Sequence, residues 1–415
     1  MKIFVIGAGV SGLTCAKVLT EQGLEVEVFE ASDGVGGRVR TDEREGFLLD
    51  RGFQVLFTAY PLVRRHLDLR GLELRVFDPG AIICRGREKS VLADPFRDPV
   101  SFLPSALSTA ATLRDKLSTL GLAARELRGG AVAAGEEDGG LDTTTREYLR
   151  RLGFSERYIG SFFRPFYGGI FLDRSLSTSA RVFRFTFRML AAGRAAVPAR
   201  GMGRIPQQLA ARLPEGTIHL MSPVEGLLED GGRIRGVRVN GREREADAVV
   251  LATDAPAAGR LVGVKVPGGA VGEVCVYYAT NGLGAGKKIL LNASEGAFIN
   301  NAAEMSKVSE EYAPRGRHLL SAVAPGVHDG LSDEEIYRRG IEEISRWFPE
   351  ARLEPLTLYR IPYCQFAQPP GFRTALPKTR TRTPGLFLAG EYTVDSSING
   401  AMLAGERAAR EVLAG

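Results

Sequence analysis

Three glycines near the start of the chain, Gly7, Gly9 and Gly12, have the spacing at which a backbone turn can hold a pyrophosphate. The first allows a tight turn, the second lets phosphates approach the main chain, and the third lets a following helix pack closely. The N–H groups at the start of a helix point toward such an anion. The candidate phosphate-binding residues are Gly7, Gly9, Val10, Ser11 and Gly12.

The segments around these glycines predict a βαβ unit. The apolar run at residues 2–6 is typical of a buried parallel strand, and apolar residues at helical spacing predict a helix over 10–22. A second strand is expected over 24–29. It leads into Glu30, whose carboxylate can accept hydrogen bonds from a ribose hydroxyl. In this context the glycines indicate a dinucleotide site rather than a turn that binds nothing.

A second glycine turn follows the acid directly. Residues 31–41 read ASDGVGGRVRT, in which two adjacent glycines are followed by an arginine. Adjacent glycines let the backbone approach a phosphate or ribose, and an arginine offers a planar fork of donors to an anion. The alternative for the arginine is a solvated surface charge. The candidate cofactor-binding residues here are Ala31, Gly36, Gly37 and Arg38.

With these two turns the sequence resembles the flavin amine oxidase superfamily, which includes amine oxidases, protoporphyrinogen oxidases and carotenoid desaturases. The resemblance implies FAD as the cofactor, with the double-glycine segment closing over its adenosine diphosphate part. It also implies that residues 47–57 pass beside the reactive flavin ring. There Gly52 would leave room for the ring, and Phe53 and Gln54 are candidates for the chamber wall. An ordinary β-turn with a core phenylalanine is the alternative. Val224 falls where the family packs a backbone amide against the adenine.

The C-terminal region contains another strand-to-helix signal. An apolar run at 385–389 leads into Gly390 and Glu391, and residues 398–412 predict a helix. Glu391 can accept hydrogen bonds from ribitol hydroxyls, and the helix start can face the flavin edge that becomes negative on reduction. The candidate residues are Gly390, Glu391, Ile398, Asn399 and Ala401. This segment looks closer to carotenoid and squalene-type desaturases than to amine oxidases.

The length of 415 residues predicts two domains. We expect an α/β fold with a Rossmann-like FAD-binding domain and an α+β substrate-binding domain. The first is assigned to residues 1–78, 198–262 and 376–415, and the second to 79–197 and 263–375. The run GLGAG at 282–286 could form a second nucleotide site, but a strand rather than a helix is expected after it, which favours a hairpin loop. One flavin and no separate nicotinamide domain are therefore expected.

The central region predicts a place for an apolar ligand. Residues 143–190 contain eight of the 21 phenylalanines, a density that indicates a core or a pocket wall, and the turn-rich residues 164–169 are expected to contact the ligand. Before them an apolar stripe at helical spacing is expected to pack in the core, with contact to a membrane surface as the alternative. Its members are Leu103, Leu107, Ala110, Leu113, Leu117 and Leu120.

The composition argues against several classes of function. The net charge is +5, but basic and acidic residues are interleaved, so no nucleic-acid partner is expected. Four cysteines and four histidines without ligand spacing predict no metal site. Cys364 could form a covalent bond to the flavin, as a cysteine does in the similar monoamine oxidases, but a buried, unreactive thiol is expected. Lys287 or Lys288 could lie beside the flavin, but a solvated lysine is expected. No signal peptide or membrane span is seen, so we expect a cytoplasmic protein, soluble or resting on a membrane surface. The sequence defines no oligomeric state.

These observations predict an FAD-dependent oxidoreductase that transfers a hydride from a mainly apolar substrate, such as a polyene or isoprenoid, to flavin N5. An amine oxidase is the alternative, favoured if Tyr363 and Tyr392 form an aromatic pair beside the flavin. A redox-neutral flavin-containing isomerase, or an FAD-binding protein without catalysis, is a second alternative.

Overall fold

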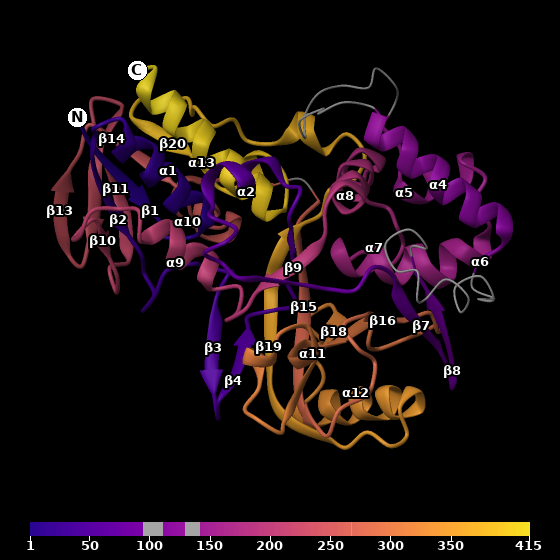
Figure 1. Cartoon of the computed structure of the whole chain (residues 1–415). Helices are drawn as coiled ribbons and strands as arrows, with labels where there is room; N and C mark the ends of the chain where they lie inside the picture. The colour runs from indigo at the N-terminus through magenta and orange to yellow at the C-terminus, as the bar shows by residue number, and fades with distance from the viewer. Residues whose placement is uncertain (94–110, 129–141, 267) are drawn as a thin grey trace.

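The computed structural model describes residues 1–415 except 94–110, 129–141 and 267. A five-stranded parallel sheet surrounds the N-terminal strand, at the upper left of Figure 1, in the order β10-β2-β1-β14-β20. In that order the strands are Ile218–His219, Glu25–Phe29, Lys2–Ile6, Ala248–Leu251 and Leu386–Leu388. Both ends of the chain and a middle segment therefore build one sheet, which confirms the predicted Rossmann-like α/β fold.

Two helices pack side by side next to this sheet, α1 (Val10–Glu21) and α13 (Ile398–Leu413) (Figure 1). Glycines allow the close approach, because a Cβ at Gly12 would lie 2.0 Å from the carbonyl oxygen of Gly7, and one at Gly405 would lie 2.2 Å from that of Ser11. The Ser11 hydroxyl donates to the Ala389 carbonyl at the end of β20. The N-terminal and C-terminal motifs of the sequence therefore meet in space.

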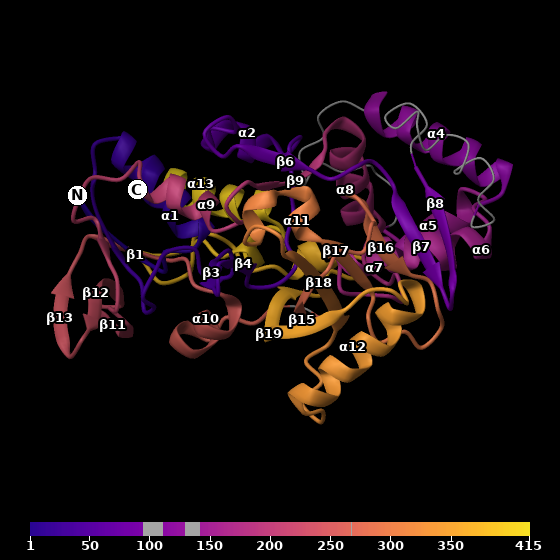
Figure 2. The same ribbon diagram turned by 60° about the horizontal axis from the view of Figure 1, so that its bottom comes forward.

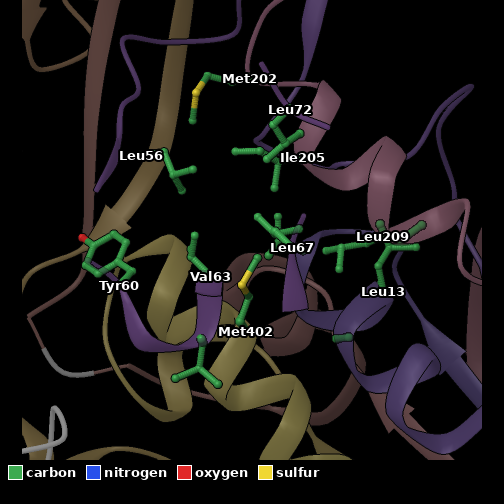
Figure 3. Packing of buried hydrophobic residues seen from close by; sticks show 14 of the residues in the cluster. Leu13, Leu56, Tyr60, Val63, Leu67, Leu72, Met202, Ile205, Leu209 and Met402 are labelled. Atoms are coloured by element: carbon green, nitrogen blue, oxygen red, sulfur yellow. The ribbon is translucent and has the colours of Figure 1, made fainter. Parts of the chain in front are cut away.

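Apolar side chains fill the core between these helices and two others, α2 (Pro61–His66) and α9 (Arg204–Ala210) (Figure 3). Leu13, Val63, Ile205 and Met402, one from each helix, are fully buried. Burial of a large aliphatic side chain stabilises a fold by about 1.5–3 kcal/mol. This packing fixes the start of α1 and the start of α13 relative to each other.

A seven-stranded mixed sheet forms the second part of the molecule, at the lower centre of Figure 1. Its neighbouring strands are antiparallel except β16 and β7. In the order β19-β15-β18-β17-β16-β7-β8 they are Leu353–Phe366, Ala270–Thr280, His318–Pro325, Asn301–Glu304, Ile289–Asn292, Ala81–Arg85 and Glu88–Leu92. Helix α12 (Asp333–Trp347) buries Ile344 and Trp347 in the core cluster beside this sheet (Figure 2). Ser332 caps α12 by accepting from the Glu335 N–H at 3.2 Å.

The glycine-rich residues 282–286 connect β15 to β16. These two strands are not neighbours, because β18 and β17 lie between them in the sheet. The predicted hairpin loop is therefore wrong. The strand expected after these glycines is confirmed. A nucleotide-binding turn would need a helix at this point, so residues 282–286 do not have the context of a nucleotide site.

Helices form most of the described residues from 113 to 192, at the upper right of Figure 1. They are α4 (Leu113–Arg128), α5 (Thr145–Arg151), α6 (Glu156–Tyr158), the π-helix η2 (Ile159–Phe163), α7 (Arg164–Ile170) and α8 (Ala180–Ala192). The predicted turn at 164–169 is wrong, since these residues form α7. Its glycines serve close packing, because a Cβ at Gly168 would lie 3.0 Å from Arg174, and one at Gly169 would lie 2.8 Å from the Asn301 side chain.

The apolar stripe of the sequence is only partly described, because Leu103, Leu107 and Ala110 lie outside the described residues. The other three members lie on or toward the surface: Leu113 is 75% exposed, Leu117 60% and Leu120 41%. Core packing is thus the wrong prediction for these three. The buried residues of α4 are Leu122 and two acids, Asp115 and Glu126. The acids bind the Ser155 N–H (2.8 Å) and the Arg184 guanidinium (2.8 Å).

The remaining elements complete the two parts. The strands are β3 (Thr41–Arg44), β4 (Phe47–Asp50), β5 (Leu56–Phe57), β6 (Leu74–Val76), β9 (Ala195–Pro198), β11 (Val224–Asp230), β12 (Arg233–Val239) and β13 (Arg242–Glu245). The helices are α10 (Ala255–Val262), α11 (Met305–Val308), η3 (Glu310–Tyr312), η4 (Phe372–Ala375) and η5 (Glu391–Thr393). The boundaries of the two domains stay a prediction. None of the described helices has the length and apolar character needed to cross a bilayer.

Candidate active site

A cavity of about 1530 Å³ connects the parallel sheet with the seven-stranded sheet and with the helices at 113–192. At one end it is lined by the two glycine turns, and at the other by aromatic and aliphatic side chains. The segment at 51–55 and strands β15 and β19 border it between these ends. Most of the residues that the sequence marks as candidates therefore border one space.

The two glycine turns are held together by backbone contacts. Gly9 and Gly36 form an isolated parallel bridge, and the Gly36 N–H donates to the Ala8 carbonyl at 2.8 Å. The φ angles of Gly7 (102°), Gly36 (118°) and Gly37 (58°) favour glycine. No side chain caps the start of α1, so its first N–H groups are available to an anion.

The main chain at Gly9 borders open space. A Cβ placed on this residue would meet no atom within 4 Å. Val10 and Ser11 line the same part of the cavity, as do Ala31 and Val224 on the far side of the turn. A pyrophosphate and an adenosine therefore fit this end of the cavity.

Glu30 stands directly after β2 at the cavity wall. One carboxylate oxygen accepts from the Ala8 N–H at 2.8 Å, and the other accepts from the N–H (2.9 Å) and hydroxyl (2.7 Å) of Ser32. These bonds hold the acid beside both glycine turns, where a ribose hydroxyl would lie.

Arg38 and Glu391 form a polar cluster on the cavity wall. Nη2 of Arg38 lies 2.7 Å from Oε2 of Glu391, and Nη1 donates to the Cys364 carbonyl at 2.8 Å. The Tyr363 hydroxyl donates to Oε1 of Glu391 at 2.8 Å. Burial alone would lower the pKa of Arg38, but the charge of Glu391 raises it overall, so the guanidinium stays charged. Both charged side chains line the cavity and could donate to or accept from a dinucleotide.

The turn at Gly52 lines the same cavity, next to the segment that contacts Arg38. Its φ of 97° favours glycine, and a Cβ there would lie 2.8 Å from the Glu273 carboxylate. Phe53 and Gln54 line the cavity beside it. The Gln54 amide donates to the carbonyl oxygens of Arg38 (2.8 Å) and Arg51 (3.1 Å), which ties this wall to the second glycine turn.

Glu273 of β15 is a cavity residue that the sequence analysis did not select. Its side chain lies against Gly52, and one carboxylate oxygen accepts from the Phe53 N–H at 3.1 Å. Burial raises the pKa of this carboxyl to about 7, an effect that the Phe53 N–H partly offsets. The available signal was a single acid inside the apolar strand 270–280.

The candidate residues of the helix starts divide between the cavity lining and the packed interior. Ile398 and Ala401 of α13 line it, whereas Gly12 and Asn399 are packed inside the fold. Oδ1 of Asn399 accepts from the Leu62 N–H at 3.1 Å, which joins α13 to α2. A Cβ at Gly390 would lie 2.0 Å from the ring of the neighbouring Tyr392.

Tyr363 and Tyr392 are not among the described residues that line the cavity. The ring of Tyr392 is fully buried, and the hydroxyl of Tyr363 is bound to Glu391. Burial raises the pKa of both hydroxyls. This placement does not favour an aromatic pair facing the ligand.

The far end of the cavity is apolar. The aromatic residues of 143–190 divide between two roles, since Phe163 and Phe183 are fully buried in the core whereas others face the cavity. The apolar wall consists of Phe162, Phe166, Phe187, Leu117 and Leu120. An apolar ligand could thus lie beside the Gly52 turn and extend between these rings.

Cys364 and the lysines at 287 and 288 differ in their position relative to the cavity. Cys364 lines the cavity, and burial raises the pKa of its thiol, which disfavours the reactive thiolate. Nζ of Lys288 lies 3.8 Å from the Asp78 carboxylate, and neither Lys287 nor Lys288 is among the described residues that line the cavity. In the described part of the chain no group of three or more His, Cys, Asp or Glu residues could hold a metal ion.

A parallel sheet whose carboxyl edge carries two glycine turns, joined to a chamber with an apolar end, is the arrangement of a flavoprotein oxidoreductase. Comparison with known proteins identifies the family. The model of the flavin containing amine oxidoreductases matches residues 10–413, so the chain belongs to that family. It is an FAD-dependent oxidoreductase.

The names of individual relatives and structural neighbours indicate different substrates. The 15-cis-phytoene desaturase of Synechococcus elongatus is 24% identical over 459 residues, covering 100% of this chain and 96% of the relative. Among solved structures, putrescine oxidase bound to putrescine has a TM-score of 0.74 at 19% identity, with 100% of both chains covered. A putative protoporphyrinogen oxidase from Exiguobacterium has a TM-score of 0.74 at 17% identity, with 99% of this chain and 98% of that chain covered. At these identities the structures define the fold and leave the substrate open.

Proposed function

We propose that this enzyme dehydrogenates an elongated, mainly apolar substrate of the polyene or isoprenoid class. The observation that carries the proposal is the continuity of one cavity from the glycine turns, past Gly52, to the wall of Phe162, Phe166 and Phe187. The similarity to 15-cis-phytoene desaturase along the whole chain supports the same substrate class.

The chain would hold FAD through three groups of residues. The phosphates would bind at Gly9 and the start of α1, a ribose at Glu30, and the ribitol at the pair of Arg38 and Glu391. A bound FAD supplies a hydride acceptor at N5. The backbone at Gly52 and the side chain of Phe53 would then border the reacting part of the substrate.

Substrate binding at the far end would rest on burial. Apolar surface removed from water contributes about 25 cal/mol per Å². Rings on the wall would hold a long chain in one register, and the exclusion of water would keep the reacting carbon near the hydride acceptor. Positioning would therefore supply much of the rate acceleration.

Oxidation of an amine is the competing proposal, supported by the fold shared with putrescine oxidase. The Glu273 carboxylate inside the cavity also favours it, because a carboxylate attracts an ammonium group. The positions of Tyr363 and Tyr392 away from the cavity weigh against it.

The test is anaerobic mixing of the FAD-loaded protein with polyenes, isoprenoids, porphyrinogens and amines. Bleaching of the oxidised flavin band by polyenes or isoprenoids is expected. Bleaching by amines alone would replace the apolar proposal with the amine one. Isomerisation of a polyene without bleaching would assign a redox-neutral reaction instead.

We further propose that apolar substrate enters from a lipid surface at α4. Leu113, Leu117 and Leu120 are exposed, yet they also line the cavity. Arg114 and Arg125 are exposed on the same helix and could contact anionic headgroups. An exposed apolar face that opens into an apolar cavity gives a water-insoluble substrate a short path.

Co-sedimentation with vesicles tests this contact. The wild-type protein should bind vesicles that contain anionic lipid more tightly than neutral ones. Leu113→Glu and Leu117→Glu should weaken binding, whereas Leu413→Glu, at a leucine 44% exposed on α13, should not. Equal binding by all variants would contradict the assignment to α4.

A further inference from the structure

Glu273 differs from the other carboxylates of the cavity in being buried without an ion pair to any described residue. Glu391 is paired with Arg38, Asp78 lies near Lys288, and Glu30 has donors on both oxygens. Asp254 and Glu225 each accept one backbone N–H, but both are more exposed than Glu273. Among the described residues, the Glu273 carboxylate accepts one hydrogen bond, from the Phe53 N–H to Oε1, and it has no ion pair. Its side chain is nearly buried, with 5% of the residue exposed, and it borders the cavity.

The location of this acid is fixed by the backbone. Glu273 lies on β15, which is paired on both sides, with β18 and with β19. The absence of a side chain at Gly52 makes room for the carboxylate, since a Cβ there would lie 2.8 Å from Oε1. The acid is therefore held between the Gly52 turn and the cavity, where the reacting part of a ligand would lie.

We propose that Glu273 accepts the proton that the substrate loses during dehydrogenation. This inference rests on the proposed function. Forming a C=C bond removes two hydrogens from adjacent carbons. One would leave as a hydride with both electrons of its C–H bond, for which a bound FAD would be the acceptor. The other leaves as a proton to Oε2 of Glu273, and the electrons of its C–H bond form the new π bond. The carboxylate becomes a carboxylic acid and must release the proton before the next turnover.

The surroundings suit this role. A pKa of about 7 leaves the carboxyl charged above neutral pH and protonated below it, so one residue can both accept and release a proton. The thiols of Cys275 and Cys364 lie close by, and burial raises the pKa of both, so they stay neutral.

The charged side chains near the Glu273 carboxylate are paired with other groups. The Arg51 guanidinium, next to Gly52, is bound to Asp42 at 2.9 Å, and the charge of Arg38 faces Glu391. Residue Pro325 is the partner of Glu273 on β18 and carries no charge. Asp50 lies two residues before Gly52, and burial raises the pKa of its carboxyl to about 6. No cation among these groups holds Glu273 permanently ionised.

The test compares Glu273→Gln with Glu304→Gln in the full-length, FAD-loaded protein. The glutamine keeps an acceptor for the Phe53 N–H and removes the titration. Glu304 is a matched control, because it is a buried glutamate on β17 of the same sheet and is not among the described residues of the cavity wall.

The first measurement needs no substrate. The visible band of the bound flavin should shift in a one-proton transition between about pH 5 and pH 9. Wild type and Glu304→Gln should show the transition, Glu273→Gln should lose it, and Glu273→Asp should restore it at an altered pH. An unchanged transition in Glu273→Gln would overturn the inference, whatever the substrate proves to be.

The second measurement uses any compound that bleaches the wild-type flavin. Loss of the base should slow anaerobic bleaching by about 100-fold or more. It should also remove the fall in rate at acidic pH, with little change in substrate affinity. If the flavin of Glu273→Gln bleaches at the wild-type rate and the rate still falls at acidic pH, Glu273 is not the proton acceptor. If no compound bleaches the wild type, the proposed function fails, while the spectral titration still decides whether Glu273 exchanges a proton at the flavin.

Discussion

Arg38 and Glu391, from opposite ends of the chain, meet at 2.7 Å on the wall of one cavity. Arg38 follows the second glycine turn, and Glu391 follows the last strand of the parallel sheet. The Tyr363 hydroxyl and the Cys364 carbonyl complete the hydrogen bonds around them. This pair closes the cofactor end of the cavity only when both termini are in place.

Replacement of Glu391 by alanine should weaken FAD binding. A buried donor that loses its acceptor costs about 1–3 kcal/mol, which corresponds to an increase in Kd of about 5- to 150-fold. Flavin fluorescence during reconstitution of the apoprotein measures this change. Glu411→Ala is the control, because it breaks the Arg380–Glu411 pair, which lies half-exposed farther along α13. Equal affinities of both variants and wild type would contradict the placement of the cofactor.

Substitutions at Gly9 and Gly12 should have opposite consequences. Gly9→Val should fold, because its φ of −72° suits any residue and a Cβ there meets no atom within 4 Å, but the side chain would fill the space for the phosphates. Gly12→Val should fail to fold, because a Cβ would lie 2.0 Å from the Gly7 carbonyl oxygen. Circular dichroism and flavin absorbance separate the two outcomes. Normal FAD content in Gly9→Val would show that the phosphates lie elsewhere.

Local backbone requirements explain which parts of the site the sequence predicts. The glycine turns at 7–12 and 36–37 are readable because most of these glycines meet a local backbone requirement: Gly7, Gly36 and Gly37 have positive φ, and Gly12 packs against the Gly7 carbonyl. Glu273 was missed because its partner, the Phe53 N–H, is 220 positions away in the chain. A lone acid in an apolar strand contains no local signal of the turn that it will face.

The same distinction applies to the fold. Strand and helix periodicity predicts the parallel strands, α1 and α13, since burial on one side imposes the pattern. It did not predict which side of α4 is buried. Asp115 and Glu126 turn inward because Ser155 and Arg184, distant in sequence, bind them. Leu113, Leu117 and Leu120 therefore face outward, which the apolar stripe alone does not indicate.

The stability of the protein should depend on pH through Asp50. Burial raises the pKa of this carboxyl from 3.8 to about 6, although Thr41, Tyr312 and the Met202 N–H donate to it. The folded pKa exceeds the unfolded one, so the contribution to stability is present below the unfolded pKa and is lost as the pH rises through about 6. The loss amounts to about 3 kcal/mol. Asp50→Asn should remove this dependence in urea unfolding measured at several pH values.

Asp42→Asn provides the contrast for that experiment. Burial alone would raise the pKa of Asp42, but its hydrogen bonds with Arg51 and Tyr359 lower it overall. Its contribution to stability is therefore present above the unfolded pKa and is lost as the pH falls through the lowered value. If the free energy of unfolding depends on pH in the same way in Asp42→Asn and Asp50→Asn, the burial of Asp50 does not control the pH dependence of stability.

Two neighbouring phenylalanines should separate ligand binding from folding. Phe166 lines the cavity and is partly exposed. Phe166→Ala should therefore lower the affinity for an apolar ligand, because less apolar surface is buried on binding. The free energy of unfolding should change less. Phe163 is fully buried among other rings, so Phe163→Ala should lower the free energy of unfolding by about 3–5 kcal/mol. Urea unfolding and perturbation of the flavin spectrum by a bound polyene measure the two quantities. If Phe166→Ala binds the polyene as tightly as wild type, the ligand does not extend along the aromatic wall, and the apolar substrate loses its main structural support.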